Sequence, residues 1–143
     1  MNLSYELTTE RQMQLGLVVL QSDETLEYDM RRLLPEDVEL LVSRVASGTE
    51  LSTDMIAAME GRLTDAANLL PRDAVISAVG YGCTSASAQI GSARVAELIK
   101  RGFPRRMSRT RPPRLLPHAA RLGLAGLVWS APISPASRTG SAP

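Results

Sequence analysis

The single cysteine of the chain, Cys83, lies in the segment Gly80-Tyr-Gly-Cys-Thr-Ser85, whose residue types suit chemistry on a carboxylate. An apolar run precedes this segment and a helical pattern follows it, so Cys83 is expected between a strand end and a helix start. Amide N–H groups and the positive end of a helix dipole stabilise a thiolate at such a position. Cys83 is therefore a candidate nucleophile or base, and Thr84 and Ser85 could donate hydrogen bonds to a carboxylate or a developing oxyanion.

The same loop also fits a structural role for Cys83, in which the thiol is not reactive. A lone cysteine cannot form an internal disulfide, and free cysteines are often small, buried, apolar side chains. Cys83 would then pack under the sheet, while Thr84 or Ser85 would cap the following helix.

A second polar segment, Gln21–Thr25, follows another apolar run. It supplies Ser22 and Asp23 as candidate substrate-binding residues. Asp23 also has an alternative role, because an aspartate just before a helical pattern is a favoured helix N-cap.

Three apolar runs rich in β-branched residues alternate with three segments of helical spacing. This alternation predicts an α/β fold of three layers, with a parallel sheet that carries helices on both faces. Such folds bind ligands beyond the carboxyl ends of their strands, so the candidate loops are expected at one edge of the sheet. The predicted strands are 15–20, 38–45 and 74–80, and the predicted helices are 25–34, 52–70 and 85–100.

The start of the chain lacks the basic and apolar regions of a signal peptide, and no apolar run approaches the roughly 18 residues of a membrane span. A soluble cytoplasmic protein without membrane association is expected. The sequence also lacks a glycine-rich dinucleotide fingerprint, a phosphate loop and a cluster of metal ligands. We therefore expect no cofactor and no metal.

The segment Tyr81-Gly-Cys-Thr-Ser85 resembles the first catalytic-cysteine motif of the aspartate/glutamate racemase, maleate cis-trans isomerase and arylmalonate decarboxylase superfamily. Residues 16–27 resemble the opening strand, polar loop and acidic helix of that superfamily, and Ser43-Arg-Val45 resembles the end of its second strand. The loop Leu20-Gln-Ser-Asp-Glu-Thr25 is most similar to the ectoine-utilisation branch. The resemblance covers residues 14–102 and therefore only the N-terminal half of a family member.

This resemblance implies one flavodoxin-like half of a two-half racemase fold, in which each half contributes a cysteine to a shared cleft. Cys83 would move the proton next to a carboxylate in a racemase, or add to the double bond in an isomerase. Thr84 and Ser85 would hold the carboxylate. Asp23 stands where maleate isomerases carry asparagine, so an amino-acid-like substrate fits better than maleate. Decarboxylases carry glycine in place of Cys83, which argues against that activity.

Residues 103–143 do not continue the α/β pattern established by residues 1–102. Acidic residues stop at Glu97, and the remaining chain is basic and rich in proline. We expect an irregular or disordered tail, and the scarcity of aromatic residues argues against nucleic-acid binding. A shifted reading frame can be tested by reading each codon's third base together with the first two bases of the next codon. In that frame, the codons for Met107-Ser108 and for residues 126–133 can encode segments that resemble the second half of a family member, in the correct order. The tail is therefore interpreted as a second half translated in a shifted reading frame.

Two functions remain as hypotheses. The first is a truncated racemase or isomerase, weakly active or inactive, that takes a small carboxylate or amino-acid-like substrate in ectoine degradation. The second is a catalytically inactive α/β fragment that binds a carboxylate or a partner, with Cys83 structural. A sheet edge left exposed by a missing second half would favour a homo-oligomer. Thiol reactivity separates the two functions.

Overall fold

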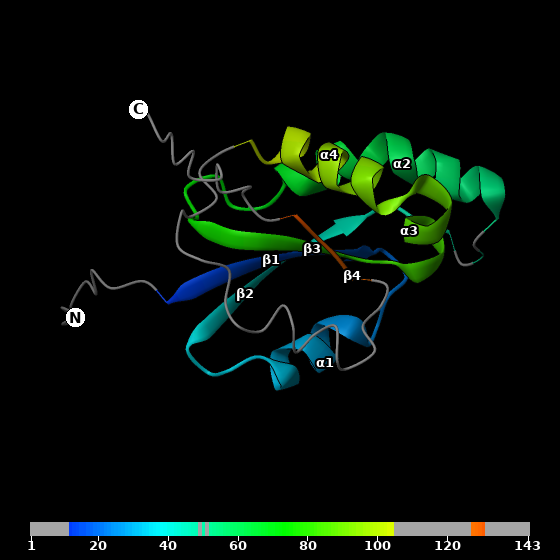
Figure 1. Ribbon diagram of the computed structural model, residues 1–143. Helices are drawn as coiled ribbons and strands as arrows, with labels where there is room; N and C mark the ends of the chain where they lie inside the picture. The colour runs from blue at the N-terminus through cyan, green and yellow to red at the C-terminus, as the bar shows by residue number, and fades with distance from the viewer. Residues whose placement is uncertain (1–11, 49, 51, 105–126, 131–143) are drawn as a thin grey trace, which may run out of the picture.

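The computed structural model describes residues 12–48, 50, 52–104 and 127–130. Its centre is a sheet in the order β2-β1-β3-β4, in which β1 pairs in parallel with both β2 and β3, and β4 runs antiparallel to β3 (Figure 1). The prediction of an α/β fold around three parallel strands is confirmed. The strands are β1 (Met13–Leu20), β2 (Val38–Val45), β3 (Ile76–Gly82) and β4 (Leu127–Ser130).

The central strand β1 is buried along nearly its whole length, from Gln14 to Val19. An apolar run without polar alternation fits a strand with both faces covered. The register of β1 against β2 is unbroken from Met13 opposite Val38 to Leu20 opposite Val45. The carboxyl ends of these strands therefore lie at the same edge of the sheet, where the candidate loops begin.

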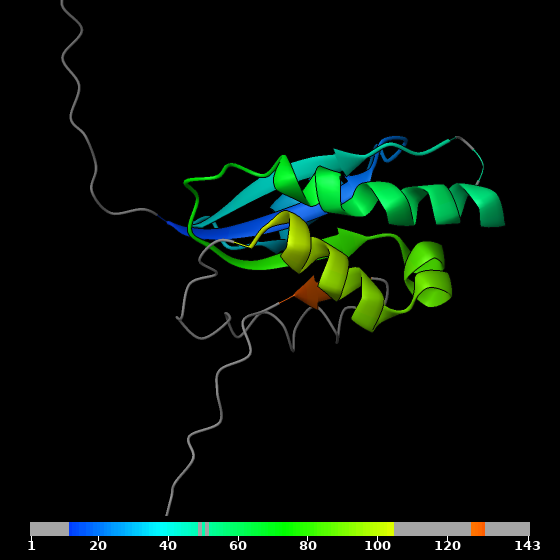
Figure 2. The ribbon, with the colours of Figure 1, turned by 90° about the horizontal axis from the view of Figure 1, so that it is seen from above.

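Helices cover the sheet on its two faces. Helix α1 lies on one side, and α2, α3 and α4 lie on the other (Figure 1). Seen from above, α2 and α4 run side by side over the strands (Figure 2). The helices are α1 (Leu26–Leu33), α2 (Thr53–Asn68), α3 (Thr84–Ile90) and α4 (Ser92–Gly102).

Each face of the sheet has its own apolar core. The larger core joins α2, α3 and α4 to the sheet, and Leu63 of α2 and Val18 of β1 are completely buried in it. The smaller core lies under α1, where Met30 packs with Leu17 and Val19. Alternate residues of β1 enter opposite cores, as the two-residue period of a strand requires.

One predicted helix is two helices in the structure. The sequence predicted a continuous helix over 85–100, but Gly91 has a φ of 90° and separates α3 from α4. Its N–H donates to the Ser87 carbonyl at 3.1 Å and its carbonyl accepts from Val95 N–H at 3.0 Å, so Gly91 closes one helix and opens the next. Only glycine adopts this backbone region readily, and the apolar spacing across residues 85–100 hid the break.

Two further expectations need correction. The third strand begins at Ile76 instead of residue 74, because Ala74 belongs to a turn in which its N–H donates to the Pro71 carbonyl at 3.1 Å. In the predicted irregular region 103–143, residues 127–130 form β4. The rest of that prediction, over 105–126 and 131–143, lies outside the described residues. None of the described helices combines the length and apolar character that a membrane crossing requires.

Candidate functional site

Cys83 lies directly between β3 and α3, as the sequence predicted. It occupies the position before the first residue of α3 with an extended backbone, and its carbonyl accepts the first hydrogen bond of the helix, from Ser87 N–H at 3.0 Å. The side chain makes no capping hydrogen bond, and the residue is only 6% exposed. The thiol therefore packs within the larger core at the edge of the sheet.

Thr84 and Ser85 are the first two residues of α3, and both are exposed. Their hydroxyl groups and backbone N–H groups can meet a ligand that reaches this end of the sheet. The buried thiol and the two exposed residues adjoin in sequence at this end of β3.

Tyr81 is a partner of Cys83 that the sequence-based predictions missed. It lies two residues earlier on β3, it is 1% exposed, and its hydroxyl hydrogen-bonds with the Cys83 side chain. Burial raises the pKa of Tyr81, and the negative charge and hydrogen bond of Cys83 raise it further. The phenol therefore stays protonated and can donate to the sulfur. A spacing of two residues at a strand end, which puts both side chains on one face, was the available signal.

The buried phenol of Tyr81 predicts a pH dependence of stability. The pKa of Tyr81 is higher in the folded chain than its ordinary value of about 10, so the neutral phenol stabilises the fold fully below about pH 10. Above that pH the unfolded chain releases the proton first, and this contribution is lost. Tyr81→Phe is expected to unfold more easily at pH 8, by about 0.5–1.5 kcal/mol for the lost hydrogen bond. The deficit should shrink between pH 10 and 12, as urea unfolding at each pH would measure.

Tyr28→Phe is the control for that measurement, because it removes a phenol that is 61% exposed on α1. Its unfolding free energy should follow the unsubstituted chain across the same pH range. Parallel curves for Tyr81→Phe and the unsubstituted chain up to pH 12 would contradict the raised pKa of Tyr81.

Asp23 has a structural role at the start of α1, but it is not the N-cap that the sequence offered as its alternative, because the N-cap residue is Thr25. Its Oδ1 accepts from the backbone N–H of Thr25 at 3.1 Å and of Leu26 at 2.8 Å. These bonds satisfy donors at the start of α1 and fix the loop after β1. Any contact of Asp23 with a substrate would be made in addition to this structural role.

Ser22 lies next to a loop that follows β2. Its Oγ is 3.2 Å from the Oγ of Ser47, and its N–H donates to the same Ser47 oxygen at 3.4 Å. Ser22 is exposed and at the sheet edge predicted for it. Ser47 joins the candidate site through this contact, and it lies in the segment 46–48 after the second predicted strand, one of the loops expected at this edge of the sheet.

Arg44 anchors the loop that carries Ser22 and Asp23. Its Nη1 donates to the carbonyl oxygens of Leu20 at 3.1 Å and Asp23 at 2.7 Å, and its Nη2 lies 3.4 Å from Glu27 Oε2. An arginine in a largely apolar strand was a signal for this role. Arg44 therefore positions the loop from the neighbouring strand.

The Asp23 loop and the Cys83 loop meet through packing. A side chain at Gly82 would overlap Leu26, the first residue of α1, so α1 approaches the end of β3 closely. Among the described residues, no hydrogen bond or ion pair joins Asp23 directly to Cys83. The structure thus brings Ser22, Asp23, Cys83, Thr84 and Ser85 to one edge of the sheet without direct polar contact between the two loops.

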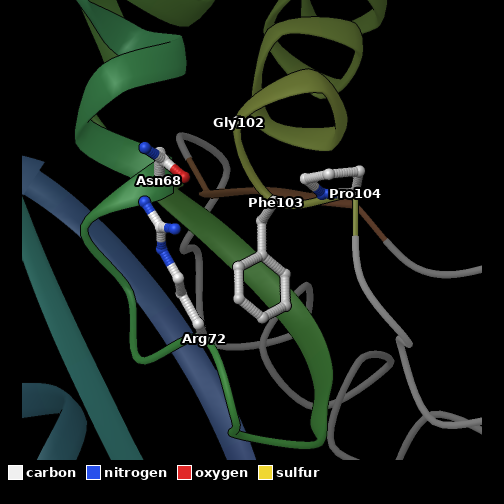
Figure 3. Close-up of a pocket in the computed structure, with 5 residues that line it drawn as sticks. All are labelled: Asn68, Arg72, Gly102, Phe103 and Pro104. Carbon is white, nitrogen blue, oxygen red and sulfur yellow. The ribbon is translucent and has the colours of Figure 1, made fainter.

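A cavity of about 230 Å³ lies away from these loops. It is found where α2 and α4 end, near the start of β3, and it contains none of the predicted site residues (Figure 3). The residues that line it are Asn68, Arg72, Gly102, Phe103 and Pro104. Ligands of parallel α/β sheets bind at the opposite edge, so this cavity is not part of the candidate site.

Within the described ranges, no three side chains of His, Cys, Asp or Glu are grouped as metal ligands would be. The residues with hydroxyl groups within two positions of Cys83 in the sequence are Tyr81, Thr84 and Ser85. A scan against protein-family models, a search of curated proteins and a search of solved structures each found no match, so the family resemblance rests on the residues of the sequence.

Proposed function

We propose that residues 1–102 are the N-terminal half of a cysteine-dependent enzyme of the aspartate/glutamate racemase and maleate isomerase superfamily. The observation that carries this proposal is the position of Cys83 directly after β3 and before α3, with exposed donors on Thr84 and Ser85. The parallel order of β1, β2 and β3 supports a flavodoxin-like half with three layers. The ectoine-utilisation branch is the finer assignment, supported by the loop after β1.

The chemistry proposed for Cys83 is proton transfer or addition next to a carboxylate. In a racemase, the thiolate removes the proton from the α-carbon, and the resulting electron pair is delocalised into the carboxylate. A proton then returns to the opposite face from the second half. In an isomerase, the sulfur adds to one carbon of the double bond, rotation follows, and the carbon–sulfur bond breaks again. Tyr81 donates to the sulfur when the thiolate is present.

The donors of Thr84 and Ser85 hold the substrate carboxylate in both reactions. Negative charge develops on that carboxylate as the α-proton leaves, and exposed N–H and O–H groups at a helix start stabilise it. Asp23 supports an amino-acid-like substrate, since its Oδ2 can accept from an ammonium group. A small carboxylate or amino acid is therefore the proposed substrate class.

The second candidate function is a catalytically inactive α/β fragment that binds a carboxylate or a partner. The burial of Cys83 favours this candidate, because a thiol that is 6% exposed also fits a structural core residue. Binding through Thr84 and Ser85 would then require no reaction at the sulfur.

Alkylation of the folded chain tests the proposal. Cys83 is the only cysteine, so iodoacetamide labelling followed by mass spectrometry reports on this thiol alone. We expect the folded chain to be labelled, and we expect aspartate, glutamate or maleate to slow the labelling by occupying the donors beside the sulfur. Thr84→Ala combined with Ser85→Ala should weaken that protection, because it removes both hydroxyl donors and leaves only the backbone N–H groups.

Ser92→Ala is the matched control, because Ser92 is an exposed serine at the first position of α4. Protection by the carboxylates should persist in this variant. If folded Cys83 resists iodoacetamide while the urea-unfolded chain reacts, and no carboxylate changes either rate, Cys83 is structural and the inactive fragment is the better function.

A further inference from the structure

Strand β2 forms an open edge of the sheet among the described residues. In the order β2-β1-β3-β4, β4 pairs with β3 on one side of the parallel strands (Figure 1). On the other side, β2 has only β1 as a neighbour. Its eight residues pair with β1 without a bulge. A regular strand with unpaired N–H and C=O groups on one side is a template for another strand.

The side chains of β2 do not guard this edge. Edge strands are commonly protected by proline, lysine or charges that project into solvent, and β2 contains no proline and no lysine. Its two charged residues, Glu39 and Arg44, are exposed, and the hydrogen bonds of both run toward β1 and the loop after it. Glu39 Oε2 accepts from Gln14 Nε2 at 2.6 Å, and Arg44 donates to backbone carbonyl groups of the loop after β1.

Half-buried apolar side chains lie on both faces at the middle of the strand. Leu41 packs at the border of the larger core, and Val42 packs at the border of the smaller one. Each is only partly covered in the single chain. A strand added alongside β2 would cover apolar surface on both faces and pair the free backbone groups at once.

The charges along β2 favour a second copy of the same strand in antiparallel orientation. Glu36 and Asp37 precede the strand and are exposed, while Arg44 lies near its end. An antiparallel pair places the acidic start of each strand near the basic end of the other, whereas a parallel pair places like charges together. The apolar centre at Leu41 and Val42 then meets its own copy, as a two-fold interface requires.

We propose that β2 is a dimerisation edge, at which two copies of this chain join their sheets through antiparallel pairing of residues 38–45 about a two-fold axis near Leu41 and Val42. This surface is distinct from the Cys83 site, and the proposal does not depend on the enzymatic function. The two Cys83 loops would belong to one continuous sheet.

Sedimentation equilibrium over a wide concentration range tests the dimer. The unsubstituted chain should approach twice its 15.4 kDa mass at high concentration. Val42→Lys should remain at the monomer mass, because it brings two ammonium groups together at the centre of the pair. Val75→Lys is the control, since Val75 is 49% exposed and precedes β3, away from this edge. A monomer for the unsubstituted chain, or a dimer for Val42→Lys, would overturn the proposal.

A cysteine scan keeps the proposal testable if Val42→Lys fails to fold. In a Cys83→Ser background, Leu41→Cys and Val42→Cys each introduce the only thiol. Residues that face their own copy across an antiparallel pair lie about 4.5–5.5 Å apart at Cα, within disulfide reach. One of these two variants should form a linked dimer on oxidation with copper phenanthroline, whereas Val75→Cys should not. Absence of linkage at both positions, or equal linkage at position 75, would also overturn the proposal.

Discussion

The 143-residue chain is expected to racemise aspartate or glutamate, or to isomerise maleate, at rates at least about 10²-fold below those of a chain that carries a complete second half. Two-base proton transfer needs one group on each face of the substrate, and this chain contains a single cysteine. A correctly placed acid or base contributes about 10²–10⁴-fold to a rate. Under the proposed function, a chain without the second half gives Cys83 neither a catalytic partner nor the opposite wall of a cleft.

The comparison requires two proteins expressed from one gene. The first is the 143-residue chain, and the second is translated with the reading frame shifted after residue 102, so that it includes the family-like segments permitted around Met107-Ser108 and residues 126–133. The frame-shifted protein should turn over aspartate, glutamate or maleate, with α-proton exchange in D₂O as an independent measurement. Cys83→Ser in that protein should lower its rate by about 10²–10⁴-fold.

Two results would count against the need for a second half. The first is ordinary turnover by the 143-residue chain that Cys83→Ser abolishes, since one half would then suffice. The second is a gene with one uninterrupted frame and no family-like sequence in the neighbouring frame, since the basic tail would then be a genuine extension. The first result would leave the chemistry of Cys83 intact and remove only the requirement for a partner.

The strands were predictable because each is a continuous apolar run. Such a run indicates a strand buried on both faces, whichever elements pack against it. β2 spans the predicted residues 38–45, and β1 ends at the predicted Leu20 but begins at Met13 instead of residue 15. The start of β3 was placed too early because Ala74 and Val75 are as apolar as the strand. Val75 N–H instead donates to the side chain of Gln14 at 2.9 Å, a contact between distant segments that local pattern does not contain.

The residues of the candidate site also differ in whether their contacts are local in sequence or depend on strand pairing. Asp23 accepts hydrogen bonds from backbone N–H groups two and three residues away at the start of α1, so a structural role there could be predicted locally. Arg44 contacts a loop more than twenty residues earlier, and that contact exists only because β1 and β2 pair in their particular register. Tyr81 is intermediate, because its spacing to Cys83 was visible but its burial was not. Residues positioned by strand pairing are therefore the ones that sequence patterns miss.

Gly102→Ala is expected to lower the free energy of unfolding by about 1–3 kcal/mol or more, as overpacking of a tight contact does. Gly102 is the last residue of α4, at a point where α4 passes very close to α2. A side chain there would overlap the backbone carbonyl oxygen of Thr64 and lie 2.9 Å from the Ala67 side chain. Backbone atoms cannot rotate aside as a flexible side chain can, so the two helices would have to separate. The same crossing holds a hydrogen bond from Thr64 Oγ1 to the Leu98 carbonyl at 3.2 Å, which separation would weaken.

Gly61→Ala is the matched control, because it makes the same chemical change in the interior of α2 where nothing lies within 4 Å of the added atom. Alanine should there stabilise the fold by about 0.5–1 kcal/mol, since glycine is unfavourable in a helix interior. The two variants should thus shift the urea midpoint in opposite directions.

Separation of α4 from α2 also loosens the core that holds Cys83, so Gly102→Ala should be alkylated faster than the unsubstituted chain under native conditions. Equal midpoints for the two variants would mean that α2 and α4 are not in close backbone contact at Gly102.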